Sequence, residues 1–330
     1  MIIEKNILKS CWKVLKYKVL YFFDENYLPE LNDLILLARF SKTDELTKIV
    51  ERKITSIGDY QTSFWPNFKL SGFYRARFHN HLKGNIKKNI LNEFNHEGEF
   101  WNPPAEITPI GRCNDKGESL LYCSTSWETA ILESRPKVGE FISVTSFNLK
   151  DKEKNPYVVQ GSRLNPIGIQ YLSQIDSLIE NEMFADYDFE NRSYDYKNLD
   201  IFLDDLFHLK TKNKNKYLYK LSVAVTKCMM KNIQMGNAIK QMHGMIYSSI
   251  ERDKKNYNIV FRPNHARVMF SIYEIQTFEI TEVNEELIKL KIKRIGMTYG
   301  TKNHPLDNLN VFWKDLTPEN QVEDILKLNE

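Results

Sequence analysis

The chain has 330 residues, of which 42% are hydrophobic and 27% are charged, a composition typical of a globular protein. Its 46 basic and 43 acidic residues nearly balance, so the net charge of +3 argues against a nucleic-acid partner. Four cysteines without a CxxC or Cys/His spacing exclude a disulfide framework and predict no metal site. The most apolar N-terminal run, ILKSCWKVLKYKVLYFF, has a lysine every few residues, which fits neither a signal peptide nor a membrane span. We therefore expect a cytoplasmic protein with no membrane or nucleic-acid partner.

The first 60 residues are predicted to be helical. ELNDLILLARF (30–40) and ELTKIVERKI (45–54) carry apolar residues at i, i+3 and i+4, with a polar break between them. Residues 1–65 are therefore a predicted N-terminal helical extension, and residues 66–330 the main domain. The extension either packs on the core, which is the simpler interpretation, or docks a partner protein or restrains a pocket.

Short apolar runs bounded by polar segments predict strands in the main domain. These runs are SGFYRARF (71–78), FISVTSFNL (141–149), GMIYSSI (244–250), YNIVF (257–261), VMFSIYEIQTFEI (268–280) and LIKLKIKRI (287–295). GMIYSSI and YNIVF flank a polar turn and are predicted to form a hairpin. EFWNPPAEITPIG (99–111) is predicted to be a loop, because its two adjacent prolines disfavour both a helix and a central strand.

Residues 151–216 differ from the rest of the chain in composition. Polar runs such as KTKNKNK surround short amphipathic pieces, which predicts an insertion of helices and loops. YLYKLSVAVTKCMM (217–230) suits a buried helix, and PENQVEDILKL (318–328) suits a closing helix. Strands followed by helices in this order favour the α+β class.

The stretch GRCNDKGESLLYCSTSWETAILE (111–133) combines a turn with polar residues of uncertain direction. NDKGE (114–118) has the residues of a tight turn and separates PIGRC from SLLYC, which predicts a hairpin. Strand alternation then puts Leu120, Tyr122 and Ser124 on one face and Leu121 and Cys123 on the other. Cys113 and Cys123 are predicted to be small core residues.

A helix is predicted to follow this turn. Thr125 and Glu128 have the S/T-x-x-E spacing of a capping box, which starts the helix at Ser126 or Trp127. The buried stripe of this helix would be formed by Trp127, Ala130, Ile131 and Ser134. Glu133 lies at the edge of that stripe, where a carboxylate can reach into a cleft. Spacing alone, however, favours solvated positions for Arg112, Tyr122 and Glu133 over one shared pocket.

The same stretch resembles the core motif of RES-domain proteins, which are bacterial toxins that consume NAD+. The family pattern is G-R-[aromatic]-N, then a tyrosine in a short strand, then A-x-x-E in the next helix, and Arg112, Tyr122 and Glu133 fit its spacing. FYRARF resembles the early arginine strand and GMIYSSI the late serine strand, which places the corresponding residues at Arg75 and Ser249. Two departures are Cys113, where an aromatic residue is usual, and the insertion at 151–216.

The resemblance implies an ADP-ribosyltransferase-like core of mixed or antiparallel strands with flanking helices. It implies a catalytic set of Glu133, Arg112 and Tyr122, and a substrate-binding set of Arg75, Ser249 and Asn114. Arginine forks suit the pyrophosphate of NAD+, a carboxylate suits an oxocarbenium-like transition state, and the tyrosine and serine would contact the nicotinamide ribose or amide. NAD+ would be a substrate, with no cofactor and no metal.

The resemblance also implies the setting of the reaction. NAD+ depletion by hydrolysis or phosphorolysis, as a toxin or defence effector, is the leading interpretation. An Xre-like antitoxin and a homodimer are the implied protein partners. The alternatives are a protein ADP-ribosyltransferase and a catalytically inactive NAD-binding regulatory protein, because residue spacing does not identify the nucleophile.

Overall fold

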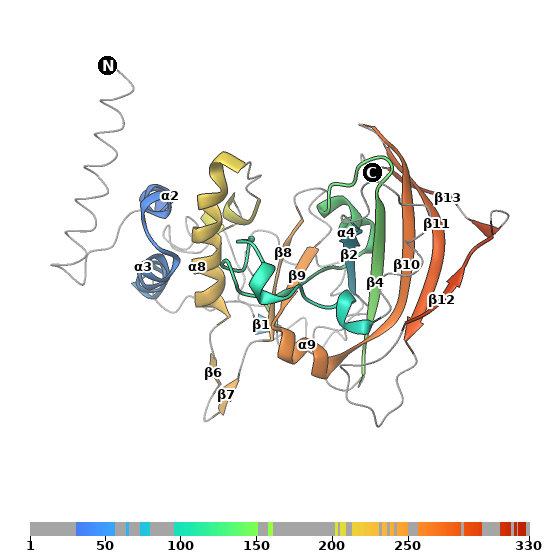
Figure 1. Ribbon diagram of the computed structural model, residues 1–330. Helices are drawn as coiled ribbons and strands as arrows, with labels where there is room; N and C mark the ends of the chain where they lie inside the picture. The colour runs from blue at the N-terminus through green and yellow to red at the C-terminus, as the bar shows by residue number, and fades with distance from the viewer. Residues whose placement is uncertain are drawn as a thin grey trace, which may run out of the picture.

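The computed structural model contains helices and one large sheet, which confirms the predicted α+β class (Figure 1). It describes residues 31–56, 64–65, 73–79, 96–150, 158–160, 202–203, 205–208, 213–230, 233–235, 238–240, 243–249, 257–284, 287–298, 311–317, 320–321 and 323–327. The helices predicted within residues 1–30 and most of the predicted insertion lie outside these residues.

An eleven-stranded sheet runs through the described part of the chain. Its strands follow the order β1 (Phe64–Trp65), β5 (Val158–Gln160), β8 (Gly244–Ser248), β9 (Tyr257–Phe261), β3 (Leu121–Ser124), β2 (Phe73–Phe78), β4 (Phe141–Leu149), β10 (Phe270–Val283), β11 (Leu287–Thr298) and β12 (Val311–Asp315), and β13 (Glu323–Lys327) also pairs with β11. Neighbouring strands are antiparallel except β5 and β8, which run parallel. A separate hairpin is formed by β6 (Ile233–Met235) and β7 (Ala238–Lys240). The ADP-ribosyltransferase-like arrangement of the core remains a prediction.

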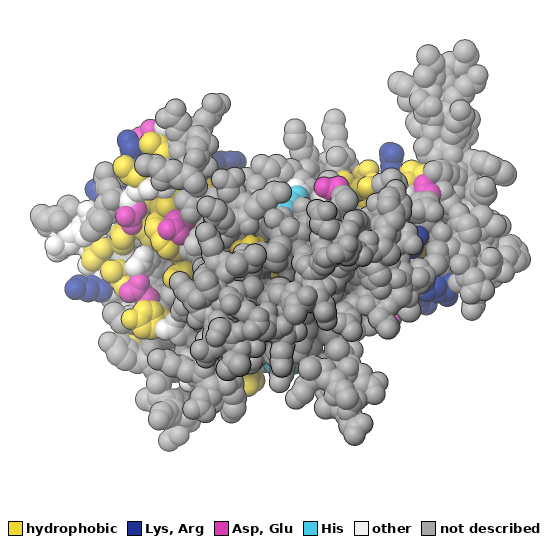
Figure 2. Space-filling view, turned by 180° about the vertical axis from the view of Figure 1, so that it is seen from behind, with side chains coloured by type: hydrophobic (Ala, Val, Ile, Leu, Met, Phe, Trp, Pro, Cys, Tyr) yellow, Lys and Arg dark blue, Asp and Glu magenta, His cyan; other side chains and the backbone are white. Residues whose placement is uncertain are grey.

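The long strands β10 and β11 curve strongly (Figure 1). Their pairing register shifts between Thr277 and Phe278, and such irregularities bend a strand and increase its twist. In the view from behind, hydrophobic and charged side chains lie intermixed over the outer strands (Figure 2), where Tyr273, Phe312 and Ile325 are exposed. Along β10, buried and more exposed residues largely alternate, which is typical of a sheet with one face toward solvent.

Helix α4 (Trp127–Glu133) covers one face of the central strands. Its Ile131 and Leu132 pack against Ile142 of β4 and Phe278 of β10. A second hydrophobic cluster, rich in aromatic residues, includes Phe73 of β2 and Phe147 of β4, whose rings stack 5.0 Å apart. Burying each large apolar side chain contributes roughly 1.5–3 kcal/mol, so β2, β3 and β4 are held firmly from both sides.

Three helices, α2 (Leu31–Phe40), α3 (Thr43–Ser56) and α8 (Tyr219–Met229), form a layer beside the β8–β9 end of the sheet (Figure 1). One hydrophobic cluster joins all three to Cys113 and to Tyr247 of β8. The helices predicted for these segments are confirmed, and α2 and α3 pack on the core through α8. None of the described helices is both long and apolar enough to cross a membrane. The division of the chain at residue 65 remains a prediction.

Residues 202–203 and 205–208 are helical, and the described elements also include three short 3-10 helices and one further α-helix. These last four are η4 (Glu97–Phe100), η5 (Ala105–Ile107), η6 (Asn213–Leu218) and α9 (Pro263–Met269). η4 and η5 lie in the segment predicted to be a loop, in which no strand or α-helix is described. That prediction is therefore confirmed in its main point.

The predicted strands are confirmed, but the closing helix is not. Residues 323–327 form β13, which pairs with the first part of β11 while β12 pairs with the last part. A strand of twelve residues presents a row of backbone N–H and C=O groups along its edge, and β13 satisfies the part that β12 leaves open. The sheet edge therefore overrides the local helical pattern.

The insertion also departs from its prediction. Residues 158–160 form β5, a strand of the main sheet that pairs with both β1 and β8. A three-residue strand has too little periodicity to be detected within a polar segment. Its position follows from the edge of β8 that it extends.

Candidate functional site

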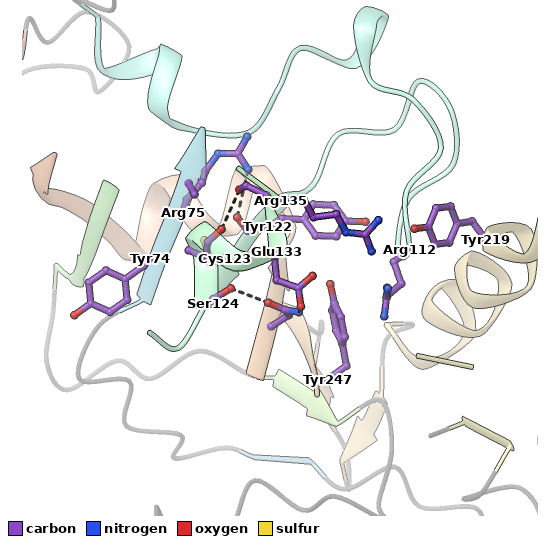
Figure 3. Close-up of a pocket in the computed structure, with 14 residues that line it drawn as sticks. Tyr74, Arg75, Arg112, Tyr122, Cys123, Ser124, Glu133, Arg135, Tyr219 and Tyr247 are labelled. Carbon is purple, nitrogen blue, oxygen red and sulfur yellow. Dashed lines mark hydrogen bonds between the residues drawn. The ribbon is translucent and has the colours of Figure 1, made fainter. Parts of the chain in front are cut away.

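A cavity of about 360 Å³ lies between α4, the N-terminal end of α8 and strands β2, β3, β8 and β9 (Figure 3). It is lined by Tyr74, Arg75, Ala76, Arg112, Tyr122, Cys123, Ser124, Ala130, Glu133, Ser134, Arg135, Tyr219, Tyr247 and Asn258. Four of the six predicted site residues are among them, namely Arg75, Arg112, Tyr122 and Glu133. The other two, Ser249 and Asn114, do not line the cavity but form hydrogen bonds with lining residues, Ser249 with Glu133 and Asn114 with Tyr122.

The pairing register of four strands explains why lining residues from distant parts of the chain meet. Tyr247 of β8 pairs with Asn258 of β9, Asn258 pairs with Ser124 of β3, and Ser124 pairs with Tyr74 of β2. Directly opposed residues on paired strands point to the same face of the sheet. One row of the sheet therefore carries four lining residues to the same level of the cavity.

Glu133 comes from the last turn of α4, which begins at Trp127, one of the two predicted starts, but has a different N-cap from the predicted one. Ser126 is the N-cap, and its Oγ accepts a 3.2 Å hydrogen bond from the backbone N–H of Thr129. Thr125, predicted to be the cap, instead accepts a bond at its Oγ1 from the backbone N–H of Tyr257. Because the Thr125 side chain is hydrogen-bonded to β9, the next residue, Ser126, caps the helix instead.

The carboxylate of Glu133 is held by two donors from distant strands. Ser249 Oγ donates to Oε1 at 2.5 Å, and Asn258 Nδ2 donates to the same oxygen at 2.7 Å. Ser124 Oγ in turn donates to Asn258 Oδ1 at 2.7 Å, which orients the amide (Figure 3). Ser249 and Asn258 are 2% and 5% exposed, so these bonds are shielded from water. The chain fixes the direction of the carboxylate before any ligand binds.

Two of the three arginines that line the cavity, Arg75 and Arg112, come from segments outside α4. Arg75 projects from β2, donates from Nη1 to the backbone oxygen of Tyr122 at 3.3 Å, and has a buried Nε without a hydrogen-bond partner among the described residues. Arg112 donates from Nη1 to the backbone oxygen of Phe207, and its guanidinium carbon lies 5.9 Å from the centre of the Tyr247 ring. Burial lowers the pKa of Arg75, but arginine titrates so far above neutrality that the group stays charged. Each guanidinium has five N–H donors in a planar fork, a geometry that suits the paired oxygens of a phosphate.

Tyr122 offers its ring to the cavity, because its hydroxyl is engaged elsewhere. The hydroxyl donates to Asn114 Oδ1 and accepts from the backbone N–H of Cys113, both at 2.8 Å. Burial raises the pKa of Tyr122 well above its ordinary value, so the phenol keeps its proton. Asn114 also donates to the backbone oxygens of Pro109 and Asp115, which commits its whole amide to the loop. The structure thus places Asn114 as a support for Tyr122.

The loop before β3 is not the predicted hairpin. The turn itself exists, since Gly117 has a φ of 82° and its N–H donates to the oxygen of Thr108. No strand is described between 101 and 120, and β3 already has β2 on one side and β9 on the other. Because both edges of β3 are occupied, the residues before it have no edge to pair with.

Cys113 and Cys123 are buried core residues, as predicted. Burial raises the pKa of the Cys113 thiol to about 12, and it raises the pKa of the Cys123 thiol as well. Cys113 lies behind Tyr122 and is not among the residues that line the cavity. Where the resemblance implies an aromatic residue, this chain therefore has a small, protonated side chain under the tyrosine.

Several lining residues were not identified from the sequence. Asn258 had a detectable signal, because a single amide in the apolar strand YNIVF needs buried partners. Tyr219 and Tyr247 had none, since tyrosines at a helix start or in a strand are ordinary core residues. Arg135 follows Glu133 closely, but its direction depends on a backbone turn with a φ of 52°.

The lining therefore combines arginine N–H donors, tyrosine rings and one oriented carboxylate. This set suits a ligand that carries phosphate groups and flat rings. Among the described residues, no group of three His, Cys, Asp or Glu side chains is placed to hold a metal ion. The absence of a metal from the reaction remains a prediction.

Comparison with known proteins gives one match. A family model described as the RES domain matches residues 87–172, a segment that contains Arg112, Tyr122 and Glu133. Searches of curated proteins and of solved structures found no match. Arg75, Tyr247, Ser249 and Asn258 lie outside the matched segment, and the fold brings them to the same cavity or to its glutamate. The RES-domain resemblance of the motif around Arg112, Tyr122 and Glu133 is therefore confirmed over this segment.

Proposed function

We propose that this protein is an NAD+-consuming enzyme that cleaves the bond between nicotinamide and ribose. The observation that carries the proposal is the carboxylate of Glu133, oriented by Ser249 and Asn258 at a cavity that arginines and tyrosines line. The match to the RES-domain family model supports it.

Arg75 and Arg112 suit the pyrophosphate of NAD+, because guanidinium groups bind phosphate oxygens with paired N–H donors. Anchoring the pyrophosphate leaves the nicotinamide ribose to occupy the part of the cavity beside Glu133. Binding energy from this distant group can then be used to position the reacting carbon.

Cleavage of the glycosidic bond releases neutral nicotinamide and leaves positive charge on the ribose. A carboxylate close to that carbon stabilises the developing oxocarbenium ion, as in glycoside hydrolysis. Glu133 is the one acidic side chain in the lining, and its hydrogen bonds hold it in a single direction. The same carboxylate can orient the incoming nucleophile on the ribose.

The aromatic residues of the lining suit the ring systems of the substrate. Tyr122 and Tyr247 have buried hydroxyls with raised pKa values, so both remain neutral phenols. Neutral rings can stack on nicotinamide or adenine without competing for the pyrophosphate.

Water as nucleophile would yield ADP-ribose, and inorganic phosphate would yield ADP-ribose 1''-phosphate. Each reaction also releases nicotinamide and one proton. Our proposal is NAD+ depletion by one of these routes, with the protein acting as a toxin or defence effector. An Xre-like antitoxin and a homodimer belong to the same proposal.

The test is product analysis of the purified full chain incubated with NAD+, with and without phosphate. We expect nicotinamide together with ADP-ribose or its 1''-phosphate, and loss of turnover by about 100-fold or more in Glu133→Ala. Glu128→Gln, in the same helix but outside the cavity lining, serves as the matched control. Intact NAD+ under both conditions, with undiminished cell toxicity of Glu133→Ala, would show the proposal to be wrong. Transfer of label from NAD+ to a cellular protein would instead favour protein ADP-ribosylation.

A further inference from the structure

Arg135 reaches the cavity through an uncommon backbone conformation. Among the described residues it is the one residue other than glycine with a positive φ, 52°. Its N–H donates to the oxygen of Leu132 at 2.9 Å, so it occupies the left-handed position that ends a helix, where glycine is usual. A side chain with a Cβ is disfavoured there, and such residues cluster at functional sites.

This turn decides where the arginine points. Two residues after Glu133, the chain leaves the helix, and Pro136 follows as a buried residue. Arg135 itself is exposed and lines the cavity. Figure 3 shows its side chain running past Tyr122 toward the side where Arg112 and Tyr219 lie. The strained residue therefore places an exposed cation at the mouth of the cavity.

The charges of the lining show what kind of ligand this cation suits. The lining contains three arginines, Arg75, Arg112 and Arg135, and one acidic residue, Glu133, so it has an excess of two positive charges. Arg75 and Arg112 are partly buried, and each donates one bond to a backbone carbonyl. A pyrophosphate carries two negative charges, and an exposed arginine at the entrance can bind its outer phosphate.

We propose that Arg135 is a third pyrophosphate-binding residue, held in place by the left-handed turn that ends α4. This inference rests on the proposed function and extends it. It assigns the entrance of the cavity to the phosphate part of the substrate, and the region beside Glu133 to the nicotinamide ribose.

The experiment measures binding of ADP-ribose, which carries the pyrophosphate and is not consumed, by isothermal titration calorimetry of the full chain. Arg135→Gly removes the guanidinium and permits the same backbone turn. We expect its dissociation constant for ADP-ribose to rise about 10- to 100-fold, the effect of losing a hydrogen bond to a charged group. Arg135→Lys keeps the charge and should lose less. Lys137→Ala removes a nearby exposed positive charge outside the lining, and its affinity should change less than about 2-fold.

Two further measurements separate this role from a structural one. The melting temperature of Arg135→Gly should equal or exceed that of the wild type, because glycine relieves the strain at a positive φ. Its affinity for nicotinamide riboside, which lacks phosphates, should match that of the wild type. An equal loss of both ligands would overturn the inference, since Arg135 would then shape the cavity as a whole.

Different results would overturn the role of Arg135 and the proposed function. Wild-type affinity of Arg135→Gly for ADP-ribose, with tight binding by the wild type, would overturn the role of Arg135 alone. No binding of either ADP-ribose or NAD+ by the wild type would overturn the proposed function itself.

Discussion

Ser249 Oγ donates a 2.5 Å hydrogen bond to Glu133 Oε1, although the two residues are 116 positions apart in the chain. Asn258 donates to the same oxygen, so a helix and two neighbouring segments of a hairpin converge on one carboxylate. The bonds cross from α4 to the β8–β9 end of the sheet. Any change in the register of β8 or β9 would therefore alter the direction of Glu133.

The first prediction concerns the positioning of this carboxylate by Asn258. Asn258→Ala removes one donor, and we expect kcat for NAD+ cleavage to fall about 10-fold or more while KM changes less than about 3-fold. Asn258→Asp has the same shape and keeps the oxygen that accepts from Ser124. It also places a second carboxylate against Glu133, so it should lose more activity than Asn258→Ala. Steady-state kinetics of both variants provide the measurement. A rise in KM with unchanged kcat would contradict the positioning role.

Ser249 provides an independent check on the same unit. Ser249→Ala and Asn258→Ala should each lower kcat in the wild type but have little further effect in a Glu133→Gln background, because they act through that side chain. Full additivity of the losses would show that Ser249 and Asn258 act on the substrate separately.

The second prediction concerns Gly111 at the base of the loop that holds Arg112. A Cβ at this position would lie 2.4 Å from Asn114 Oδ1 and 3.1 Å from the Tyr122 hydroxyl. Gly111→Ala should therefore break the Asn114–Tyr122 bond and lower the free energy of unfolding by about 1–3 kcal/mol. Gly98→Ala is the control, since its Cβ would meet nothing within 4 Å. Urea denaturation of the two variants tests the difference, and equal stability would contradict it.

The third prediction distinguishes the observed helix cap from the one predicted by sequence pattern. Ser126→Ala removes the cap of α4 and should cost about 1 kcal/mol of unfolding free energy. Glu128→Ala, which removes the side chain that a capping box requires, should change stability by less than about 0.5 kcal/mol. Thermal or chemical denaturation measures both. A larger effect at Glu128 than at Ser126 would favour the capping box.

The fourth prediction follows from the buried thiol of Cys113. Burial raises its pKa to about 12, so its thiolate forms at a higher pH in the folded protein than in the unfolded chain. Alkylation by iodoacetamide at pH 8 should therefore leave Cys113 unmodified in the native protein and modify it after denaturation, as read by peptide mass spectrometry. Cys228, which is only partly buried, should react sooner. Rapid native labelling of Cys113 would refute its burial.

The same shift has a consequence for stability. A raised pKa in the folded state means that the stability from this group is complete below about pH 9 and is lost as the pH rises toward 12. Burial also raises the pKa values of Tyr122 and Tyr247, which act in the same direction. Cys113→Ala should make the alkaline decline of unfolding free energy less steep.

Sequence patterns located the elements that have a clear period of their own. FISVTSFNL alternates and forms β4 with the same bounds, and the buried pattern of 217–230 contains α8. Spacing alone favoured solvated positions for Arg112, Tyr122 and Glu133, and only the family resemblance of the motif predicted that they share a pocket. They meet because strand β3 and helix α4 are adjacent in the chain and pack directly on each other.

The remaining features depend on partners far away in the sequence. Residues 323–327 form a strand because the edge of β11 needs hydrogen-bond partners. Thr125 does not cap α4 because its side chain is hydrogen-bonded to β9. Asn258 faces Glu133 because the register of four strands puts it in the same row as Ser124. The amino-acid sequence by itself determined which residue types are available to the cavity and where the regular elements lie. Only the tertiary structure decided which side chains converge there, because strand register, free sheet edges and the left-handed turn at Arg135 are set by long-range hydrogen bonds and packing.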